Sequence, residues 1–505
     1  MRLSLLICVA LAWLTDVRAA EPKPITVTVG HEFKLTLQYN ASTGYQWVLA
    51  KPPEEKLVKL LGTEYQRLDP KRVGAGGDMV LTFQALAEGR TEMGLNYVRP
   101  WEKGDKPAQT TNFVIVIEAG QAKGKQPYPI VGTGQTRCYD DTKEIPCPQP
   151  GKPFYGQDAQ YEGLLPSYKD NGDGTVTDLN TGLIWVQARG AKVTWEAAVA
   201  GAAACRVGGH SDWRMPSIKA LYSLITFTGS FRGSAAASTP YLNTNYFGFV
   251  YGDESKGERA IDSQDWSATQ YVGTTMNGDA TVFGVNFADG RIKGYPKMRP
   301  GPGGGVAHKL YVRYVRGNPS YGQNDFHDNG DGTITDRATG LMWARADGKV
   351  GMDWAAALAW VQTRNAEKHL GYNDWRLPNA KELQSIVDYT RAPAVTRSPA
   401  LSPLFQTTAL SDGEYAFFWS STTHLDGPPD RQGSAAVYVA FGRALGWMQF
   451  PPQSGNYRLL DVHGAGAQRS DPKSGNPAAY PHGRGPQGDV IRINNHVRLV
   501  RTAVR

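Results

Sequence analysis

The chain has 505 residues, of which 57 are Gly and 32 are Pro, and it is 41% hydrophobic and 20% charged. This composition excludes a fibrous or disordered chain, and the length predicts about three domains. The net charge is +7 without any run of Lys or Arg, so nothing in the sequence points to nucleic acid as a partner.

The first residues have the pattern of a secretory leader. Arg2 supplies a positive start, Leu3–Leu14 an apolar stretch, and Val17–Ala19 a small-residue cleavage site. We therefore interpret residues 1–20 as a signal peptide and expect an exported protein, either periplasmic or secreted to the cell surface. No later stretch reaches the roughly 18 apolar residues that a membrane helix needs, so no membrane span is predicted.

Residues 21–119 are predicted to form short strands separated by turns. Alternating apolar and polar residues mark six segments: 25–29, 33–39, 45–49, 79–85, 91–98 and 111–119. This density of strands without a helical pattern is typical of a β-sandwich.

The stretch that follows is rich in Gly, Pro and Lys and has no hydrophobic periodicity, so residues 120–159 are interpreted as a linker. It contains Cys138 and Cys147, which we expect to form a disulfide in an exported protein. Cys205 is then left over. It lies in an alanine-rich helical run, which favours a buried, unreactive thiol over a nucleophile.

The rest of the chain contains a duplication. KDNGDGTVTDLNTGLIW (169–185) returns as HDNGDGTITDRATGLMW (327–343). Four further landmarks recur in the same order: an alanine-rich run (194–205 and 353–364), a DWRMP or DWRLP motif (212–216 and 374–378), WSATQ or WSSTT (266–270 and 419–423), and VRYVR or VRLVR (312–316 and 497–501). A period this long predicts two tandem domains, 160–317 and 318–505.

Each copy is predicted to be a mixed α+β domain. The DGT motif indicates a hairpin with Gly at its turn, and the alanine-rich run indicates a helix. Ser217 and Asn379, each directly after a Pro, are expected to cap a second helix. Residues 281–295 and 435–450 alternate like strands.

Catalytic and metal motifs are not evident. With Gly174 or Gly332 in the sixth position of an EF-hand loop, Lys169 and His327 fall on the first ligand position, so the calcium register fails. An Asx turn opening a hairpin explains DNGDGT better. Calcium in another geometry stays an alternative, and no other cofactor or metal is expected. The sequence therefore predicts a protein that is not an enzyme.

Three turns of the first block have an unusual composition: NASTG (40–44), GAGG (74–77) and RPW (99–101). In a sandwich, alternate loops emerge at the same end, so the three can lie side by side. Gly-rich tips allow close approach of another surface, and Trp101 in a polar loop is an anchor-like residue. The alternative is three ordinary turns and one partly buried Trp.

These three motifs, in this order, resemble the chagasin family of cysteine-peptidase inhibitors, over about residues 22–119. The resemblance implies an immunoglobulin-like sandwich whose loops enter the active-site cleft of papain-like cysteine peptidases, with Thr43 central over the catalytic Cys/His pair. One departure is Ala41, where the family usually has Pro, which implies a looser first loop and weaker inhibition. The implied peptidase-binding residues are Asn40, Ala41, Ser42, Thr43, Gly44, Gly74, Ala75, Gly76, Gly77, Arg99, Pro100 and Trp101.

The duplicated block resembles the Lcl C-terminal domain, an exported bacterial domain grouped with C-type-lectin-like folds. The resemblance covers about residues 160–505 and rests on the GDGT, DWR, WS and VR motifs. It implies binding to a surface or a glycan, with sulfated polysaccharide as one candidate. The collagen-like stalk of the adhesin that gave the domain its name is absent from this sequence.

Two hypotheses follow. In the first, the chain is an exported inhibitor of papain-like cysteine peptidases that carries two lectin-like binding modules. In the second, it is a glycan-binding, adhesin-like surface protein, and the N-terminal sandwich is only an interaction module. The target peptidase, the glycan and the oligomeric state are not encoded in any motif.

Overall fold

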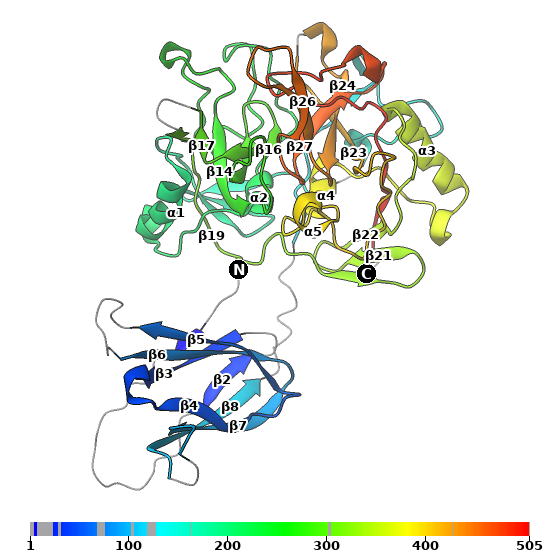
Figure 1. The fold of residues 1–505 in the computed structure, drawn as a ribbon. Helices are drawn as coiled ribbons and strands as arrows, with labels where there is room; N and C mark the ends of the chain where they lie inside the picture. Colours follow the sequence, from blue (N-terminus) through cyan, green and yellow to red (C-terminus); the bar gives the residue numbers. More distant parts are fainter. Residues whose placement is uncertain are drawn as a thin grey trace. The chain divides into compact units, whose positions relative to one another are not determined.

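The fold comes from a computed structural model that describes residues 5–7, 24–28, 32–67, 76–102, 106–118, 128–161, 163–300, 305–427 and 429–503. Most of the expected leader and the start of the expected linker lie outside these ranges. The chain divides into two compact units, Met1–Gly124 and Lys125–Arg505, which Figure 1 draws in blue to cyan and in cyan to red. Each unit has a hydrophobic core of its own.

The first unit is a sandwich of two four-stranded sheets. One sheet has the order β1 (Leu5–Ile7), β3 (Glu32–Tyr39), β6 (Gly77–Ala85) and β5 (Val58–Arg67). The other has the order β2 (Ile25–Thr28), β8 (Gln109–Glu118), β7 (Gly89–Val98) and β4 (Gln46–Lys51). Alternate residues such as Phe33, Leu35 and Ile115 are buried between the sheets, as period-two patterning requires.

The six strands predicted for this unit are all present, with ends that differ by a few residues. Two strands were not predicted: β1, whose residues the sequence analysis assigned to the leader, and β5. The register of β5 shifts between Leu60 and Gly62, and Leu60 and Leu61 are both largely exposed. A bulged edge strand with little buried surface carries no period-two pattern, so no local signal marks β5 in the sequence.

The second unit is β-rich and holds both repeats. Each repeat begins with a small antiparallel sheet: β11 (Tyr168–Asp170), β12 (Thr175–Asp178), β13 (Ile184–Val186) and β19 (Val315–Arg316) in the first, and β20 (Phe326–Asp328), β21 (Thr333–Asp336), β22 (Leu341–Ala344) and β28 (Val500–Thr502) in the second. In both, a strand from the end of the repeat closes the sheet against the DGT hairpin. The recurring VRYVR and VRLVR motifs supply that closing strand.

A single six-stranded sheet runs through both repeats. Its order is β14 (Gln264–Gln270), β15 (Thr281–Asn286), β16 (Arg291–Pro296), β27 (Gln468–Pro472), β24 (Ala435–Ala440) and β23 (Phe417–His424). The repeats meet where Ile292 of β16 pairs with Gln468 of β27. The two tandem copies therefore pack together as one compact unit.

Smaller elements complete the second unit. Its helices are α1 (Trp195–Ala204), α2 (Ile218–Tyr222), α3 (Trp354–Ala366), α4 (Ala380–Ser385) and α5 (Pro393–Thr396). Its remaining strands are β9 (Cys138–Tyr139), β10 (Glu144–Ile145), β17 (Met298–Arg299), β18 (Val306–Ala307), β25 (Leu445–Gln449) and β26 (Tyr457–Asp461). Figure 1 shows α1 and α3 at opposite flanks of the unit, one from each repeat.

The predicted helix starts are confirmed. The Ser217 side chain accepts a hydrogen bond from the Ala220 amide, and the Asn379 side chain accepts from the Lys381 and Glu382 amides. Both are N-caps that satisfy amides at the first turn of a helix. Cys205 is the C-cap that follows α1. It is a free thiol and is only partly buried, whereas the sequence analysis expected a buried thiol.

The duplication extends to individual hydrogen bonds. The indole Nε1 of Trp266 donates to the carbonyl oxygen of Val193 over 3.0 Å, and that of Trp419 donates to Met352 over 2.9 Å. The DGT turns match as well, because Asp173 and Asp331 each accept hydrogen bonds from the Thr two residues later. These are Asx turns, as the sequence predicted.

The repeats also exchange reciprocal contacts. Lys219 of α2 donates to the carbonyl oxygen of Ser385 over 2.6 Å, and its equivalent Lys381 of α4 donates to that of Ser223 over 2.8 Å. Each lysine thus caps the C-terminal end of the other repeat's helix, where backbone carbonyls lack partners. Burial lowers the pKa of Lys219 to about 8 and that of Lys381 to about 7.

The predicted linker is wrong for its described part. Residues 128–161 and 163–165, called the strap below, pack against both repeats. Gln135 donates to the carbonyl oxygens of Phe227 and Thr423, which belong to different repeats, and accepts from the Thr423 amide. The strap is built from backbone and side-chain hydrogen bonds rather than from a periodic apolar face, so its sequence resembles a linker.

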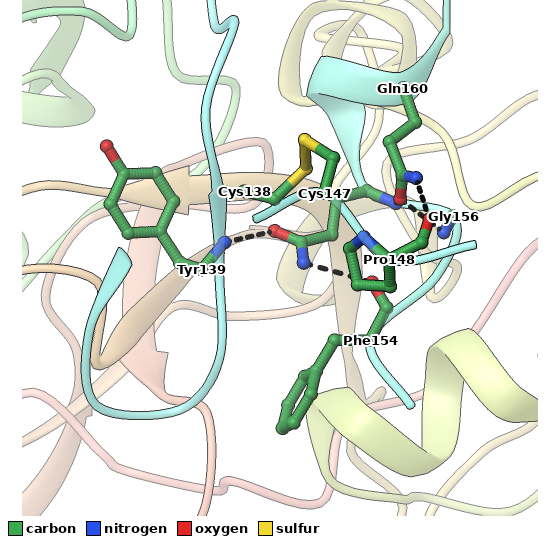
Figure 2. Close-up of a disulfide and its surroundings, with 8 residues drawn as sticks. Cys138, Tyr139, Cys147, Pro148, Phe154, Gly156 and Gln160 are labelled. Carbon is green, nitrogen blue, oxygen red and sulfur yellow. Dashed lines mark hydrogen bonds between the residues drawn. A yellow bond between two sulfur atoms is a disulfide. The ribbon is translucent and has the colours of Figure 1, made fainter. Parts of the chain in front are cut away.

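Cys138 and Cys147 form a disulfide that closes the β9–β10 hairpin of the strap (Figure 2). Next to it, Gln160 donates to the carbonyl oxygen of Pro148 over 2.7 Å and accepts from the Gly156 amide over 2.9 Å. The hairpin contacts the second repeat, where Lys473 donates to the Asp140 carbonyl oxygen over 2.9 Å. The disulfide therefore fixes a segment that lies on the repeats.

Within the described ranges, no helix is both long and apolar enough to cross a membrane. In the same ranges, no group of three or more His, Cys, Asp or Glu side chains is arranged to hold a metal ion.

Candidate functional site

The strand register brings the three unusual turns to one end of the sandwich. Tyr39 at the end of β3 pairs with Gly77 at the start of β6, which places the first and second turns side by side. Gln46 at the start of β4 pairs with Val98 at the end of β7, which places the first and third turns side by side. The first turn therefore lies in the middle.

Asn40 organises the first turn, which is a short 3-10 helix, η1 (Ala41–Thr43). Its side-chain Oδ1 accepts hydrogen bonds from the amide and the hydroxyl of Ser42, over 3.1 and 2.7 Å. Its carbonyl oxygen accepts from the Thr43 hydroxyl over 2.8 Å. The local bonding of Asn and Ser stiffens a turn that protrudes into solvent, because Ser42 and Thr43 are both exposed.

Trp101 is two-thirds exposed, at 66%, which confirms the exposure that the sequence predicted. Its ring nevertheless lies against the first turn, since a Cβ built on Gly44 would stand 2.5 Å from Trp101 Cη2. Gly44 also has φ +75°, a conformation that side chains disfavour. Glycine is therefore required at 44 both by its backbone and by the indole above it.

Arg99 connects the third turn to the first. Its Nε donates to the carbonyl oxygen of Thr43 over 3.3 Å, and its guanidinium lies 4.5 Å from the centre of the Tyr45 ring. The hydrogen bond that Arg99 donates to the Glu102 carboxylate raises the pKa of Arg99, and the two charged groups lie 3.0 Å apart. The two turns therefore form one connected surface rather than two separate tips.

Aromatic residues below the turns support this surface, and the sequence analysis missed their role. Tyr97 stacks on Tyr45 with ring centres 5.2 Å apart, packs against Trp47, and accepts a hydrogen bond from the Asn40 amide. A signal for this role was present in the sequence, because aromatic residues recur at the strand ends that flank the first and third turns.

The second turn is described only in part. Gly74 and Ala75 lie outside the described residues, whereas Gly76 and Gly77 are described at the start of β6. A Cβ on Gly76 would stand 3.6 Å from the Tyr39 carbonyl oxygen, which places this residue beside the first turn. Pro100, between Arg99 and Trp101, is exposed.

Comparison with protein families assigns both units. The Chagasin family peptidase inhibitor I42 matches residues 26–117, and the Lcl C-terminal domain matches residues 174–316 and 332–463, together more than half of the chain. The chain belongs to these two families. It carries one chagasin-family inhibitor domain followed by two Lcl C-terminal domains in tandem.

The chagasin-family unit also has a curated relative. Amoebiasin-2 of Entamoeba histolytica (strain ATCC 30459 / HM-1:IMSS / ABRM) is 30% identical over 84 residues, which is 17% of this chain and 68% of the relative. The Lcl C-terminal domains lie outside that match.

Among solved structures, the cysteine protease inhibitor EhICP2 from Entamoeba histolytica is similar at 27% identity and a TM-score of 0.18, covering 19% of this chain and 86% of that one. The structure of PbICP-C in complex with falcipain-2 is similar at 18% identity and a TM-score of 0.17, covering 23% of this chain and 98% of that one.

The tandem Lcl C-terminal matches contain the two duplicated indole hydrogen bonds of the second unit, and the chagasin-family match runs from β2 to β8 of the sandwich. The Asn40, Gly76 and Arg99 turns all lie inside that match. The connected surface they form is thus a feature of the inhibitor domain and not of a linker or terminal extension.

Proposed function

We propose that the protein is an exported inhibitor of papain-like cysteine peptidases, and that the end of the sandwich with the three turns enters the peptidase's active-site cleft. The observation that carries the proposal is the connected surface of the first and third turns, with Trp101 exposed at 66% beside Gly44. The proposed contact residues are Asn40–Gly44, Gly74–Gly77 and Arg99–Trp101.

Three properties of this surface support an inhibitor that is not cleaved. The central turn is a 3-10 helix held by Asn40, so its backbone is not presented as an extended strand for cleavage. Arg99 ties it to the third turn, which reduces the conformational entropy lost on binding. The large exposed indole offers the kind of aromatic anchor that dominates interface energies.

The decisive experiment is a titration of active papain with the sandwich (residues 21–120) and, separately, with the full chain. We expect reversible, competitive loss of activity toward a small fluorogenic substrate, with the same inhibition constant for both. Papain that keeps full activity at micromolar concentrations of either protein would exclude the inhibitor function. The sandwich should also remain uncleaved after prolonged incubation with papain.

For the second unit, the C-type-lectin-like fold and binding to a glycan, including sulfated polysaccharide, stay predictions from family resemblance. Retention of residues 125–505 on a heparin column, with elution by salt, tests the sulfated polysaccharide. Export is supported by the leader pattern of residues 1–20 and by the Cys138–Cys147 disulfide, because disulfides persist in oxidising compartments. Fractionation of cells that express the chain with its leader tests export.

A further inference from the structure

A pocket lies between the strap and the second repeat, far along the chain from the inhibitor turns. It is open to solvent, and its cavity volume is about 70 Å³. The strap contributes one wall, the start of α4 another, and β23 the floor. Its polar lining includes Asp158, Tyr161, Arg376, Glu382 and Ser421.

Two polar groups of the pocket are buried and have bonding capacity to spare. Asp158 is 7% exposed; its Oδ2 accepts from the hydroxyls of Thr133 and Thr422, over 2.7 and 2.6 Å, and within the described residues Oδ1 has no such bond. Ser421 is 1% exposed, and its hydroxyl has no hydrogen-bond partner among the described residues. The Ser421 hydroxyl is therefore a buried polar atom without a partner, which is costly and points to a missing ligand.

The charge of the pocket selects among ligands. Arg376 and Glu382 form an ion pair in which both carboxylate oxygens of Glu382 are used. With that pair neutralised, the ionised Asp158 is the remaining carboxylate of the lining. The opposing charge next to it is that of Lys381, whose Nζ donates to the lining residue Gly132 and whose pKa is lowered by burial to about 7. As Lys381 loses its charge, a cation is attracted and an anion is repelled.

The first repeat shows that the polar side chains at the positions of Ser421 and Glu382 are not needed for folding. Ala268 and Ala220 occupy the positions equivalent to Ser421 and Glu382. The backbone is nevertheless the same, because the Ala268 amide donates to Pro216 over 2.7 Å just as the Ser421 amide donates to Pro378 over 2.8 Å. The second repeat thus carries polar side chains in a frame that is stable without them.

We propose that this pocket binds a small ligand through a primary ammonium group. The ammonium donates to Asp158 Oδ1 and to the Ser421 hydroxyl, and the Tyr161 ring and Leu377 cover the alkyl part. Ammonium supplies both the positive charge and the hydrogen-bond donors that these two atoms lack.

The proposal has a pH signature. Burial raises the pKa of Asp158 to about 6, with Glu382 raising it further and the Thr422 and Thr133 hydroxyls and Arg376 opposing the shift. Lys381 also faces this carboxyl. Because the ammonium binds the ionised carboxylate, affinity should fall about tenfold per pH unit below pH 6. It should rise further as Lys381, which repels a cation, loses its proton near pH 7.

Stability without ligand should show the opposite trend. A carboxyl whose folded pKa is raised binds its proton more tightly in the folded state, so the free energy of unfolding falls as the pH rises from about 4 to 6. Asp158→Asn should remove this component.

The test is a ligand-observed NMR titration of the full chain with n-butylamine, n-butanol and pentanoate, which share a four-carbon chain and differ only in the head group. We expect saturable binding of the amine alone. Ser421→Ala, which copies the first repeat, should fold normally and weaken amine binding at least fivefold, and Asp158→Asn should abolish it. The matched control Ala268→Ser should change nothing.

Three results would overturn the proposal: no saturable amine signal at pH 7, equal binding of the alcohol or the carboxylate, or unchanged amine binding in a folded Ser421→Ala variant. Preferential binding of the alcohol would instead indicate a polyol site.

Discussion

Replacing Trp101 with Ala tests the inhibitor site most directly. The side chain is 66% exposed in the free protein, so about 160 Å² of its roughly 250 Å² remains available for burial in a complex. At about 25 cal/mol per Å², full burial of that area would contribute about 4 kcal/mol. Incomplete burial and lost side-chain freedom reduce this to about 2 kcal/mol, or roughly thirtyfold in the inhibition constant.

The loss should appear mainly as faster dissociation, because mutations at one interface change association rates little. Stopped-flow or surface-plasmon measurements with papain give both rate constants. The free energy of unfolding of the sandwich should change by less than about 1 kcal/mol, since only a third of the side chain is covered in the free protein.

A matched control is Leu86→Ala. Leu86 is also a large exposed apolar residue, at 42%, but it follows β6 at the end of the sandwich opposite the turns. This variant should inhibit normally. The reasoning is refuted if Trp101→Ala lowers the melting temperature strongly and leaves inhibition unchanged, because the indole would then be part of the core.

Three further predictions concern the turns and the strap. Gly44→Ala should weaken inhibition about tenfold, because Ala in this left-handed conformation costs about 1–2 kcal/mol and its Cβ displaces the Trp101 indole. In a Trp101→Ala background the additional loss of inhibition should be smaller. Full additivity of the two substitutions in a double-mutant cycle would contradict the contact between Gly44 and Trp101. Ala41→Pro should tighten inhibition and stabilise the sandwich by about 0.4–1 kcal/mol, because Pro suits the first position of a 3-10 turn; a weaker inhibitor would argue against preorganisation. Replacing Cys138 and Cys147 by Ser should destabilise the unit of residues 125–505 by about 2–3 kcal/mol without changing papain inhibition, and free thiols at both positions in exported protein would rule out the disulfide.

The sequence by itself determined the features that depend on local patterns. Alternating residues such as Phe33, Leu35 and Leu37 predicted β3 because the side-chain period of a strand is two. Ser217 and Asn379 predicted helix starts because a capping side chain acts within one turn. The duplication was also visible, since each repeat keeps its own internal hydrogen bonds.

At the candidate site, the sequence identified the turns and the exposure of Trp101, but not how they are joined. The contact of Trp101 with Gly44, and the bond from Arg99 to Thr43, link positions more than fifty residues apart in the chain. Only the pairing of β4 with β7 brings these positions together.

Tertiary structure alone decided the role of the strap and the union of the repeats. The sequence around Asp158 resembles that of a linker because it has no periodic apolar face. In the structure, this segment is held instead by hydrogen bonds to distant partners, such as the Thr422 hydroxyl. The six-stranded sheet depends on one antiparallel pairing, Ile292 with Gln468, that no local pattern encodes. Local patterns specify which elements form, whereas the choice of partner is set by packing between segments that are remote in the sequence.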